Sequence, residues 1–356
     1  MPVSTADTLL TNKIFGVALE KKATDIHLLS GNYPVLRIDN KLYSMADEAV
    51  LTVDVIAGLM DSFLTPEEQQ RLTVERDVKT TYTWASRARF RATVYYQKGY
   101  PAISLRLIPA AIPTPQELKI PDIIIAKIST ARGGLLIITG PFNSGRSTTV
   151  ASLLNLVNTT QSKRIVSIER PIEYILVNAK SVVDQREVGK DTPSFVQGLL
   201  DVKGDDVDVV GLGDMSEPGI EEHVLTVAES GRLVIAHMEA NSVISTLEKF
   251  IDSVPKDRRH WAKHSLSQSL LAVMNQRLVA AVGGGRVLAA SVLTMTPAVA
   301  SIIQEENFAQ LTNVMQTGRD DGMISLDLRL AELARAGTIS AEDAKNVALD
   351  PSSFRV

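Results

Sequence analysis

The sequence predicts two parts, a small α+β domain followed by a larger doubly wound α/β domain on a mostly parallel sheet. In the second part, four short apolar runs alternate with helical segments. The first part ends in alternating stretches rich in β-branched and aromatic residues. Between them, four prolines fall in the 14 residues 108–121, which suits neither a helix nor a central strand. We therefore expect domains at 1–107 and 122–356 with a linker at 108–121.

The first domain is expected to begin with a helix over 4–23, which has helical apolar spacing and a Ser/Thr/Asp start. Short extended segments, two helices and a set of antiparallel strands follow. The expected extended segments are 25–29, 33–39 and 41–45, the helices are 54–64 and 65–72, and the strands lie in 81–109. Lys98 and Gly99 mark a turn between two of those strands.

The four apolar runs of the second part are predicted to be buried strands, since they are short and apolar on both faces. They are 135–139, 164–169, 207–214 and 233–238. From about residue 255 the pattern predicts helices to the end of the chain, for example 261–278 and 325–337. Gly337 is the expected stop of the last of these.

Composition excludes some classes of protein. The 356 residues contain no cysteine, so a disulfide scaffold and a zinc–cysteine site are excluded. The chain opens with no basic stretch followed by an apolar run, and no stretch approaches 18 apolar residues, so we expect neither a secretory signal nor a membrane span. A net charge of -4 gives no basic footprint for nucleic acid.

The stretch "TGPFNSGRSTT", residues 139–149, carries the strongest chemical signal. It follows an apolar strand, precedes a helix, and fits the phosphate-loop pattern G-x-x-x-x-G-K-[ST] except that Arg146 stands in place of lysine. Glycines let the main-chain N–H groups surround a phosphate, and a helix N-terminus favours the anion. The hydroxyl of Ser147 is expected to bind Mg²⁺. The expected residues for ATP are Gly140, Asn143, Ser144, Gly145, Arg146, Ser147 and Thr148.

Two carboxylates end neighbouring apolar runs, where ligands of open α/β sheets bind. Asp214 is placed to hold the metal, directly or through water, and Glu169 to polarise the attacking water. Arg146 changes the expectation for hydrolysis more than for binding. Arginine still pairs with phosphate, but it is longer and forked, so contacts of the transition state can be lost while ground-state affinity survives.

Arginines also gather in the first domain. Arg87, Arg89 and Arg91 are expected on one strand face and Arg106 on the next strand. Arginines that reach a γ-phosphate from another domain or subunit act as fingers; the alternative is a solvated basic sheet face. The five histidines show no metal-ligand spacing.

Together these motifs resemble the type IV pilus retraction ATPases, the PilT/PilU family of secretion-type motors, over nearly the whole chain. The segments that carry the resemblance are "GPFNSGRSTT", "SIERPIEYI", "VVDQREVGKDTPSF", "GDMSEPG", "AESGRLVIAH", "GGGRVLAA" and "MQTGRDDGMISLD", with "ARFRATVYYQ" and "LRLIP" in the first domain. "QREV" at 185–188 and the linker lean towards the PilU-like branch.

The resemblance implies a PAS-like N-terminal domain, a RecA-like P-loop ATPase core and a helical C-terminal part. It implies a homo-hexameric ring, with or without a related pilus motor ATPase, on the cytoplasmic face of the bacterial inner membrane, driving pilus disassembly through a platform membrane protein. It places the catalytic glutamate on Glu169, the Walker B acid on Asp214 and the trans-acting arginines on Arg91 and Arg106.

The departures from the family pattern concentrate on one site. Arg146 replaces the loop lysine, Arg170 reverses the charge of an aspartate, Asp214 is one methylene shorter than glutamate, and Glu239 occupies a histidine position. Two readings stay open, namely a slow or partner-dependent ATPase, and a hydrolysis-deficient pseudo-ATPase that regulates another motor. A RecA-like nucleic-acid motor is a remote third. An ion pair between Glu239 and one of the added arginines is a further hypothesis.

Overall fold

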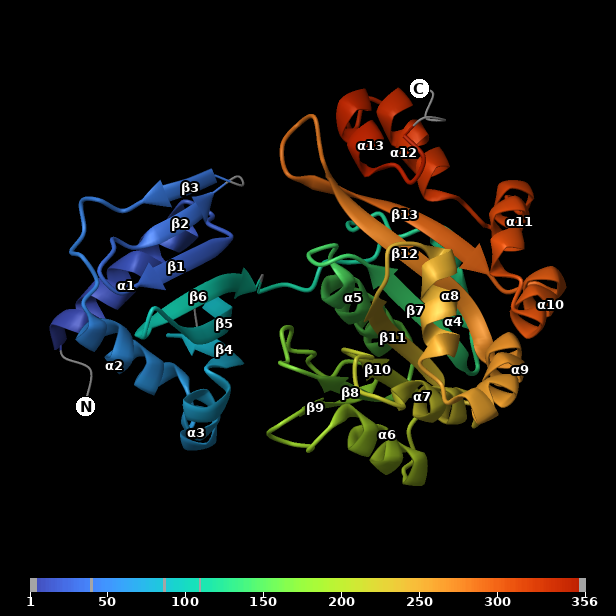
Figure 1. Ribbon diagram of the computed structural model, residues 1–356, viewed down its shortest axis with the longest axis horizontal. Helices are drawn as coiled ribbons and strands as arrows, with labels where there is room; N and C mark the ends of the chain where they lie inside the picture. The colour runs from blue at the N-terminus through green and yellow to red at the C-terminus, as the bar shows by residue number, and fades with distance from the viewer. Residues whose placement is uncertain (1–4, 39–40, 86–87, 109, 352–356) are drawn as a thin grey trace. The chain divides into compact units, whose positions relative to one another are not determined.

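The computed structural model describes residues 5–38, 41–85, 88–108 and 110–351 (Figure 1). The chain forms two compact units, which are described separately. The first contains residues 1–111 together with 171–174, and the second contains 112–170 and 175–356. The division between residues 111 and 112 falls inside the stretch predicted as a linker. In the described part of the chain, no helix combines the length and the apolar character needed to cross a bilayer.

In its described residues, the first unit has a six-stranded antiparallel sheet and three helices, which agrees with the predicted α+β class. Its strand order is β3-β2-β1-β6-β5-β4. Lys98 and Gly99 both have positive φ, which is typical of the tight turn between antiparallel strands. The elements are α1 Thr5–Glu20, β1 Asp25–Leu29, β2 Val35–Ile38, β3 Lys41–Ser44, α2 Val53–Phe63, α3 Pro66–Glu75, β4 Asp77–Trp84, β5 Ala88–Gln97 and β6 Tyr100–Ile108.

An aromatic cluster forms the centre of this unit. Phe15 of α1 is fully buried, and its ring lies 5.0 Å from that of Phe90 and 5.6 Å from that of Trp84. The Trp84 indole N–H donates to Asn12 at 2.7 Å, so the buried polar atom of the ring is satisfied. α3 begins with a capping box in which Thr65 and Glu68 satisfy each other's main-chain N–H groups.

The second unit is a seven-stranded sheet in the order β13-β12-β7-β11-β10-β8-β9, parallel except for β13. All four predicted apolar runs are confirmed as adjacent parallel strands. Its elements are α4 Asp122–Thr130, β7 Gly134–Gly140, α5 Arg146–Thr160, β8 Arg164–Glu169, β9 Val182–Glu187, α6 Phe195–Gly204, β10 Val209–Leu212, α7 Ile220–Glu229, β11 Leu233–Glu239, α8 Val243–Asp252, the 3₁₀ turn Lys256–Arg258, α9 Arg259–Ser269, β12 Leu270–Ala280, β13 Arg286–Thr294, α10 Pro297–Glu305, the 3₁₀ turn Phe308–Gln310, α11 Leu311–Thr317, α12 Leu326–Arg335 and α13 Ala341–Val347.

Both faces of the sheet are covered at its centre, which explains why β7, β10 and most of β11 are apolar on both sides. Along β7, Leu135 and Ile137 belong to the core formed with α6 to α10, whereas Leu136 and Ile138 belong to the core formed with α4 and α5. α12 and α13 pack on the β12–β13 hairpin (Figure 1). The glycine predicted to stop α12, Gly337, has φ 68°.

The expectation of helices from about residue 255 is wrong for two stretches. Of the predicted helix 261–278, only 261–269 is helical, as part of α9, and β12 begins at Leu270. β13 follows at 286–294. The apolar run "LLAVM" is buried beside β7, and periodicity does not distinguish a buried strand from a buried helix. The three glycines at 283–285 make the hairpin turn, and this was the signal for a strand pair.

Candidate phosphate-binding site

The glycine loop lies between the carboxyl end of β7 and the first turn of α5. Its glycines are required by the geometry. A Cβ on Gly140 would lie 2.4 Å from the main-chain oxygen of Gln276, and Gly145 has φ 89° as the residue that precedes the helix. Asn143 also has positive φ, 64°. The sequence motif therefore folds into a tight loop that is seated directly on β12.

The residues of the loop fit a phosphate group. Gly145 has no side chain that could occupy the N–H groups of the first turn of α5, so this helix end is open to an anion. Ser147 and Thr148 lie half-buried in that turn. Ser144 is buried, and its hydroxyl has no hydrogen-bond partner among the described residues. The first turn of α5 thus offers main-chain N–H groups to an anion, with the hydroxyls of Ser147 and Thr148 in the same turn.

Arg146 points back across its own loop. Its Nη1 donates to the Gly140 carbonyl at 2.9 Å, and its Nη2 lies 3.5 Å from Oε2 of Glu239. The arginine side chain is 14% exposed and the glutamate side chain 61%. Glu239 is opposite Gly140 in the parallel register of β11 and β7, which brings the two charges together. The hypothesis of an ion pair at this site is therefore confirmed, and its members are Arg146 and Glu239.

The two predicted catalytic carboxylates lie at the ends of β8 and β10. Glu169 accepts hydrogen bonds from Ser167 at 2.8 Å and from Gln185 at 3.1 Å. Asp214 accepts from the Met215 main chain at 2.9 Å and from the Ser216 hydroxyl. The carboxyl ends of β8 and β10 are adjacent, because the main-chain N–H of Gly213 donates to the Ile168 carbonyl at 2.8 Å.

Strand order sets how far each acid lies from the loop. β11 is next to β7, β10 is second and β8 is third. At a strand spacing of about 4.8 Å, the ends of these strands lie roughly 5, 10 and 14 Å from the end of β7. Of these three acids, Glu239 is therefore the nearest to the loop. Asp214 and Glu169 lie further out, and their roles toward the metal and the attacking water stay predictions.

Arg170, the charge reversal next to Glu169, also has an acid partner. Its Nη2 lies 3.0 Å from Oε1 of Glu217, and its guanidinium lies 5.1 Å from the ring centre of Phe195. Oε2 of Glu217 accepts from the main-chain N–H of Val196 at 3.1 Å. The pair thus links the ends of β8 and β10 to the first turn of α6, so the added charge is accommodated.

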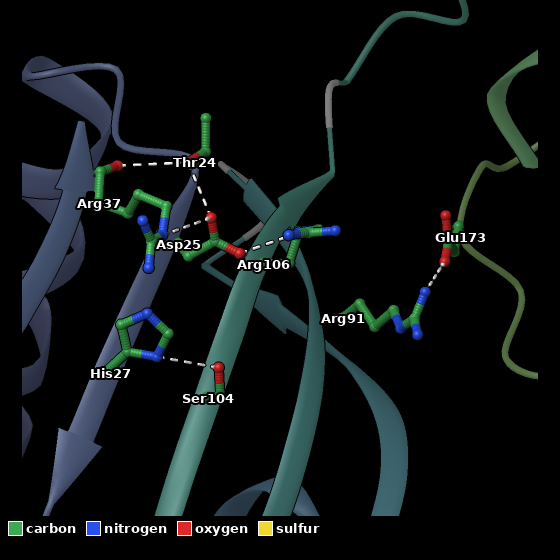
Figure 2. Close-up of polar contacts among 8 residues, drawn as sticks. All are labelled: Thr24, Asp25, His27, Arg37, Arg91, Ser104, Arg106 and Glu173. Atoms are coloured by element: carbon green, nitrogen blue, oxygen red, sulfur yellow. Dashed lines mark hydrogen bonds and ion pairs between the residues drawn. The ribbon is translucent and has the colours of Figure 1, made fainter. Parts of the chain in front are cut away.

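In the first unit, the predicted finger arginines are each paired with an acid (Figure 2). Nε of Arg106 lies 2.9 Å from Asp25, and Nη1 of Arg91 lies 2.9 Å from Glu173. Arg91 and Arg106 are opposite each other on β5 and β6, so both side chains extend from the same sheet face. Arg89 donates to the Ile172 carbonyl at 2.8 Å. The role of Arg91 and Arg106 as arginine fingers stays a prediction.

Arg87 lies outside the described residues. In the part of the chain that is described, no group of three or more His, Cys, Asp or Glu side chains is arranged to hold a metal. The Mg²⁺ roles of Ser147 and Asp214 therefore stay predictions. His27 is hydrogen-bonded to Ser104 at 3.1 Å (Figure 2), and burial lowers the pKa of its ring.

Sequence reasoning missed three residues that hold this site together. Asn275, Gln276 and Arg277 are consecutive on β12, and each donates to a main-chain carbonyl. Gln276 donates to Ser144 of the glycine motif, whereas Asn275 and Arg277 donate to the segment that follows β11. They lay inside the predicted helix 261–278, where a polar triplet has no special meaning. Three polar residues in an otherwise apolar strand were the signal that could have identified them.

A glycine loop between a buried parallel strand and a helix, with acids at the ends of neighbouring strands, defines the P-loop class of nucleotide-binding proteins. The comparisons with known proteins narrow this class. The family model described as "Type II/IV secretion system protein" matches residues 4–319. The chain therefore belongs to this family of pilus and secretion ATPases, and the resemblance seen in the motifs is confirmed.

Relatives of known function are similar over almost the whole chain. The type IV pilus retraction ATPase PilT of Pseudomonas aeruginosa is 32% identical over 344 residues, which is 96% of this chain and 99% of PilT. The type IV pilus ATPase PilU of the same organism is 31% identical over 93% of this chain and 87% of PilU. A crystal structure of the pilus retraction motor PilT with bound ADP is 35% identical, covers 95% of this chain and 97% of that one, and has a TM-score of 0.85.

Proposed function

We propose that this chain is an ATP-binding motor subunit of a type IV pilus machine and that it couples ATP hydrolysis to pilus retraction. The observation that carries the proposal is the glycine loop at the uncapped N-terminus of α5, whose main-chain donors suit a phosphate, beside strand ends that carry Asp214 and Glu169. The similarity to PilT and PilU over nearly the full length supports the pilus machinery as the setting.

In this proposal each residue has one task. The N–H groups of Gly145, Arg146 and Ser147 bind the phosphates, while Ser147 and Asp214 hold Mg²⁺, which neutralises phosphate charge when bound. Glu169, oriented by Ser167 and Gln185, accepts a hydrogen bond from the attacking water.

The proposed assembly is a homo-hexameric ring on the cytoplasmic face of the inner membrane, acting on a platform membrane protein, alone or with a related motor ATPase. Arg91 and Arg106 would then serve a neighbouring subunit's nucleotide. Each must first exchange its acid partner, Glu173 or Asp25, for phosphate.

One observation favours a second candidate function, that of a nucleotide-binding subunit without useful hydrolysis. The guanidinium of Arg146 is already engaged by the Gly140 carbonyl and Glu239. A cation held by an acid is a weaker partner for a phosphate whose charge grows in the transition state. Such a subunit would bind nucleotide, join a ring and regulate an active motor.

Binding and turnover measured on one sample separate the two functions. Purified protein is titrated with Mg-ATP by calorimetry, and phosphate release is followed alone and in a mixture with an active PilT-like motor. Turnover above an Asp214→Ala control supports the motor function. Binding without such turnover in either setting rejects it and supports the second function.

Arg146→Lys discriminates further. The motor proposal expects faster phosphate release, because lysine is a compact charge that fits the loop. The second function expects no turnover from this single change, since Arg170, Asp214 and Glu239 remain. Fast hydrolysis by Arg146→Lys would therefore exclude a deeply degenerate site.

A further inference from the structure

Three consecutive side chains of β12 contact both loops that border the phosphate site. Nδ2 of Asn275 donates to the Ala240 carbonyl at 3.0 Å, and Nε2 of Gln276 donates to the Ser144 carbonyl at 2.6 Å. Nη2 of Arg277 donates to the Asn241 carbonyl at 2.6 Å. Ser144 belongs to the glycine loop, whereas Ala240 and Asn241 directly follow β11. One strand therefore holds the main chain of two separate segments.

Strand geometry explains how one strand reaches both segments. Side chains alternate between the faces of a sheet, so Asn275 and Arg277 share one face and Gln276 takes the other. β12 is parallel to β7, and Asn275 is opposite Thr139, whose hydroxyl it also contacts at 2.9 Å. The triplet thus places side chains on both faces of the sheet beside the end of β7, where the glycine loop begins.

The glycine loop is seated on Gln276 at both of its ends. A Cβ on Gly140 would lie 2.4 Å from the main-chain oxygen of Gln276, and a Cβ on Gly145 would lie 3.3 Å from its Nε2. The hydrogen bond to Ser144 lies between these two contacts in the chain. Gln276 therefore lies against both glycines of the loop and is hydrogen-bonded to the residue before the second one.

Burying the polar atoms of this triplet costs free energy of folding. Asn275 is 0% and Gln276 1% exposed, and their Oδ1 and Oε1 atoms have no hydrogen-bond partner among the described residues. Burial also lowers the pKa of Arg277. Unsatisfied buried polar atoms cost free energy, which the hydrogen bonds donated by the two amides only partly offset. A role beyond stability accounts for the amides.

We infer that Asn275, Gln276 and Arg277 are positioning residues of the nucleotide site. Gln276 fixes the glycine loop in its anion-binding geometry, and Asn275 and Arg277 fix the segment after Glu239. The triplet thereby sets the separation of Arg146, which directly follows the glycine loop, and Glu239, which directly precedes the segment held by Asn275 and Arg277. The inference deepens the proposed function and rests on it, because the anion bound by the ordered loop is the nucleotide's phosphate.

The test compares two variants of the full chain. Gln276→Met keeps the length of the side chain and removes the donor to Ser144. Thr294→Val is the matched control, because Thr294 is 1% exposed and its hydroxyl donates to the Asp321 carbonyl at 2.9 Å, on a loop away from the glycine motif. The readouts are amide hydrogen exchange of 141–148 without nucleotide, calorimetric Kd for Mg-ADP and Mg-ATP, and Tm.

We expect Gln276→Met to speed exchange in 141–148 and to weaken both Kd values about tenfold, since a loop that is not pre-ordered must be ordered on binding. Thr294→Val should lower Tm to a similar extent and leave exchange and Kd unchanged. If Gln276→Met does not fold, Gln276→Asn, too short by one methylene to reach Ser144, is expected to give the same changes.

Wild-type exchange and Kd in the Gln276 variant would overturn the inference, as would equal changes in the control. If the wild-type protein binds no nucleotide, the proposed function fails instead. Exchange of the nucleotide-free loop still decides in that case whether Gln276 orders it.

Discussion

Replacing Glu239 by glutamine is expected to tighten nucleotide binding. Glu239 lies 3.5 Å from the Arg146 guanidinium and is, of the three strand-end acids, the nearest to the glycine loop. It therefore competes with a phosphate for the arginine, and it also repels the phosphate directly. Glutamine keeps the size of the side chain and removes both effects.

The size of the effect follows from distance and exposure. Two unit charges at the measured 3.5 Å interact by about 1.2 kcal/mol in water and about 4.7 kcal/mol at an effective dielectric constant of 20. Because the Glu239 side chain is 61% exposed, the lower value is the appropriate one, and exposed pairs contribute about 0.2–1 kcal/mol. We therefore expect the Kd for Mg-ATP to fall by about two- to fivefold.

Isothermal titration calorimetry at low and high salt measures this change. The gain should shrink at about 1 M salt, where the Debye length is only about 3 Å. Asp252→Asn is the control, since Asp252 is 66% exposed, pairs with Arg259 and lies at the far end of α8. An unchanged or weaker Kd for Glu239→Gln would refute the reasoning and would show that Glu239 orients Arg146 for binding.

Two further predictions concern stability. Burial raises the pKa of Glu221. The stabilising contribution of this carboxyl is therefore full below its ordinary pKa of 4.5 and is lost as pH rises through the raised folded-state pKa. Glu221→Gln should match the wild-type free energy of unfolding at pH 4 and exceed it at pH 8, and equal values at both pH values would contradict this. Asp25 is 7% exposed and accepts a hydrogen bond from Arg106. Asp25→Asn should therefore lower the free energy of unfolding, measured with denaturant, by about 1–2 kcal/mol. The control Glu75→Gln, in the exposed pair with Arg71, should lower it by less than about 0.5 kcal/mol.

Local patterns in the sequence were sufficient for much of the fold. The four buried strands and the glycine loop each carry their signal within about ten residues, because alternation, apolar runs and glycine positions are local properties. β12 was missed for a physical reason. Its apolar run is buried on both faces, and only pairing with β7, whose Thr139 is 136 residues before Asn275, decides that it is a strand.

The candidate site shows the same division. The sequence alone determined that the chain has a phosphate loop with arginine in place of lysine, acids at two strand ends and added charges at 146, 170 and 239. Only the tertiary structure decided which charges meet. Parallel pairing of β11 with β7 brings Glu239 to Arg146, and adjacent ends of β8 and β10 bring Arg170 to Glu217. The sequence gives the identity of each charged residue. Which residues form an ion pair depends on the order of the strands, and long-range packing sets that order.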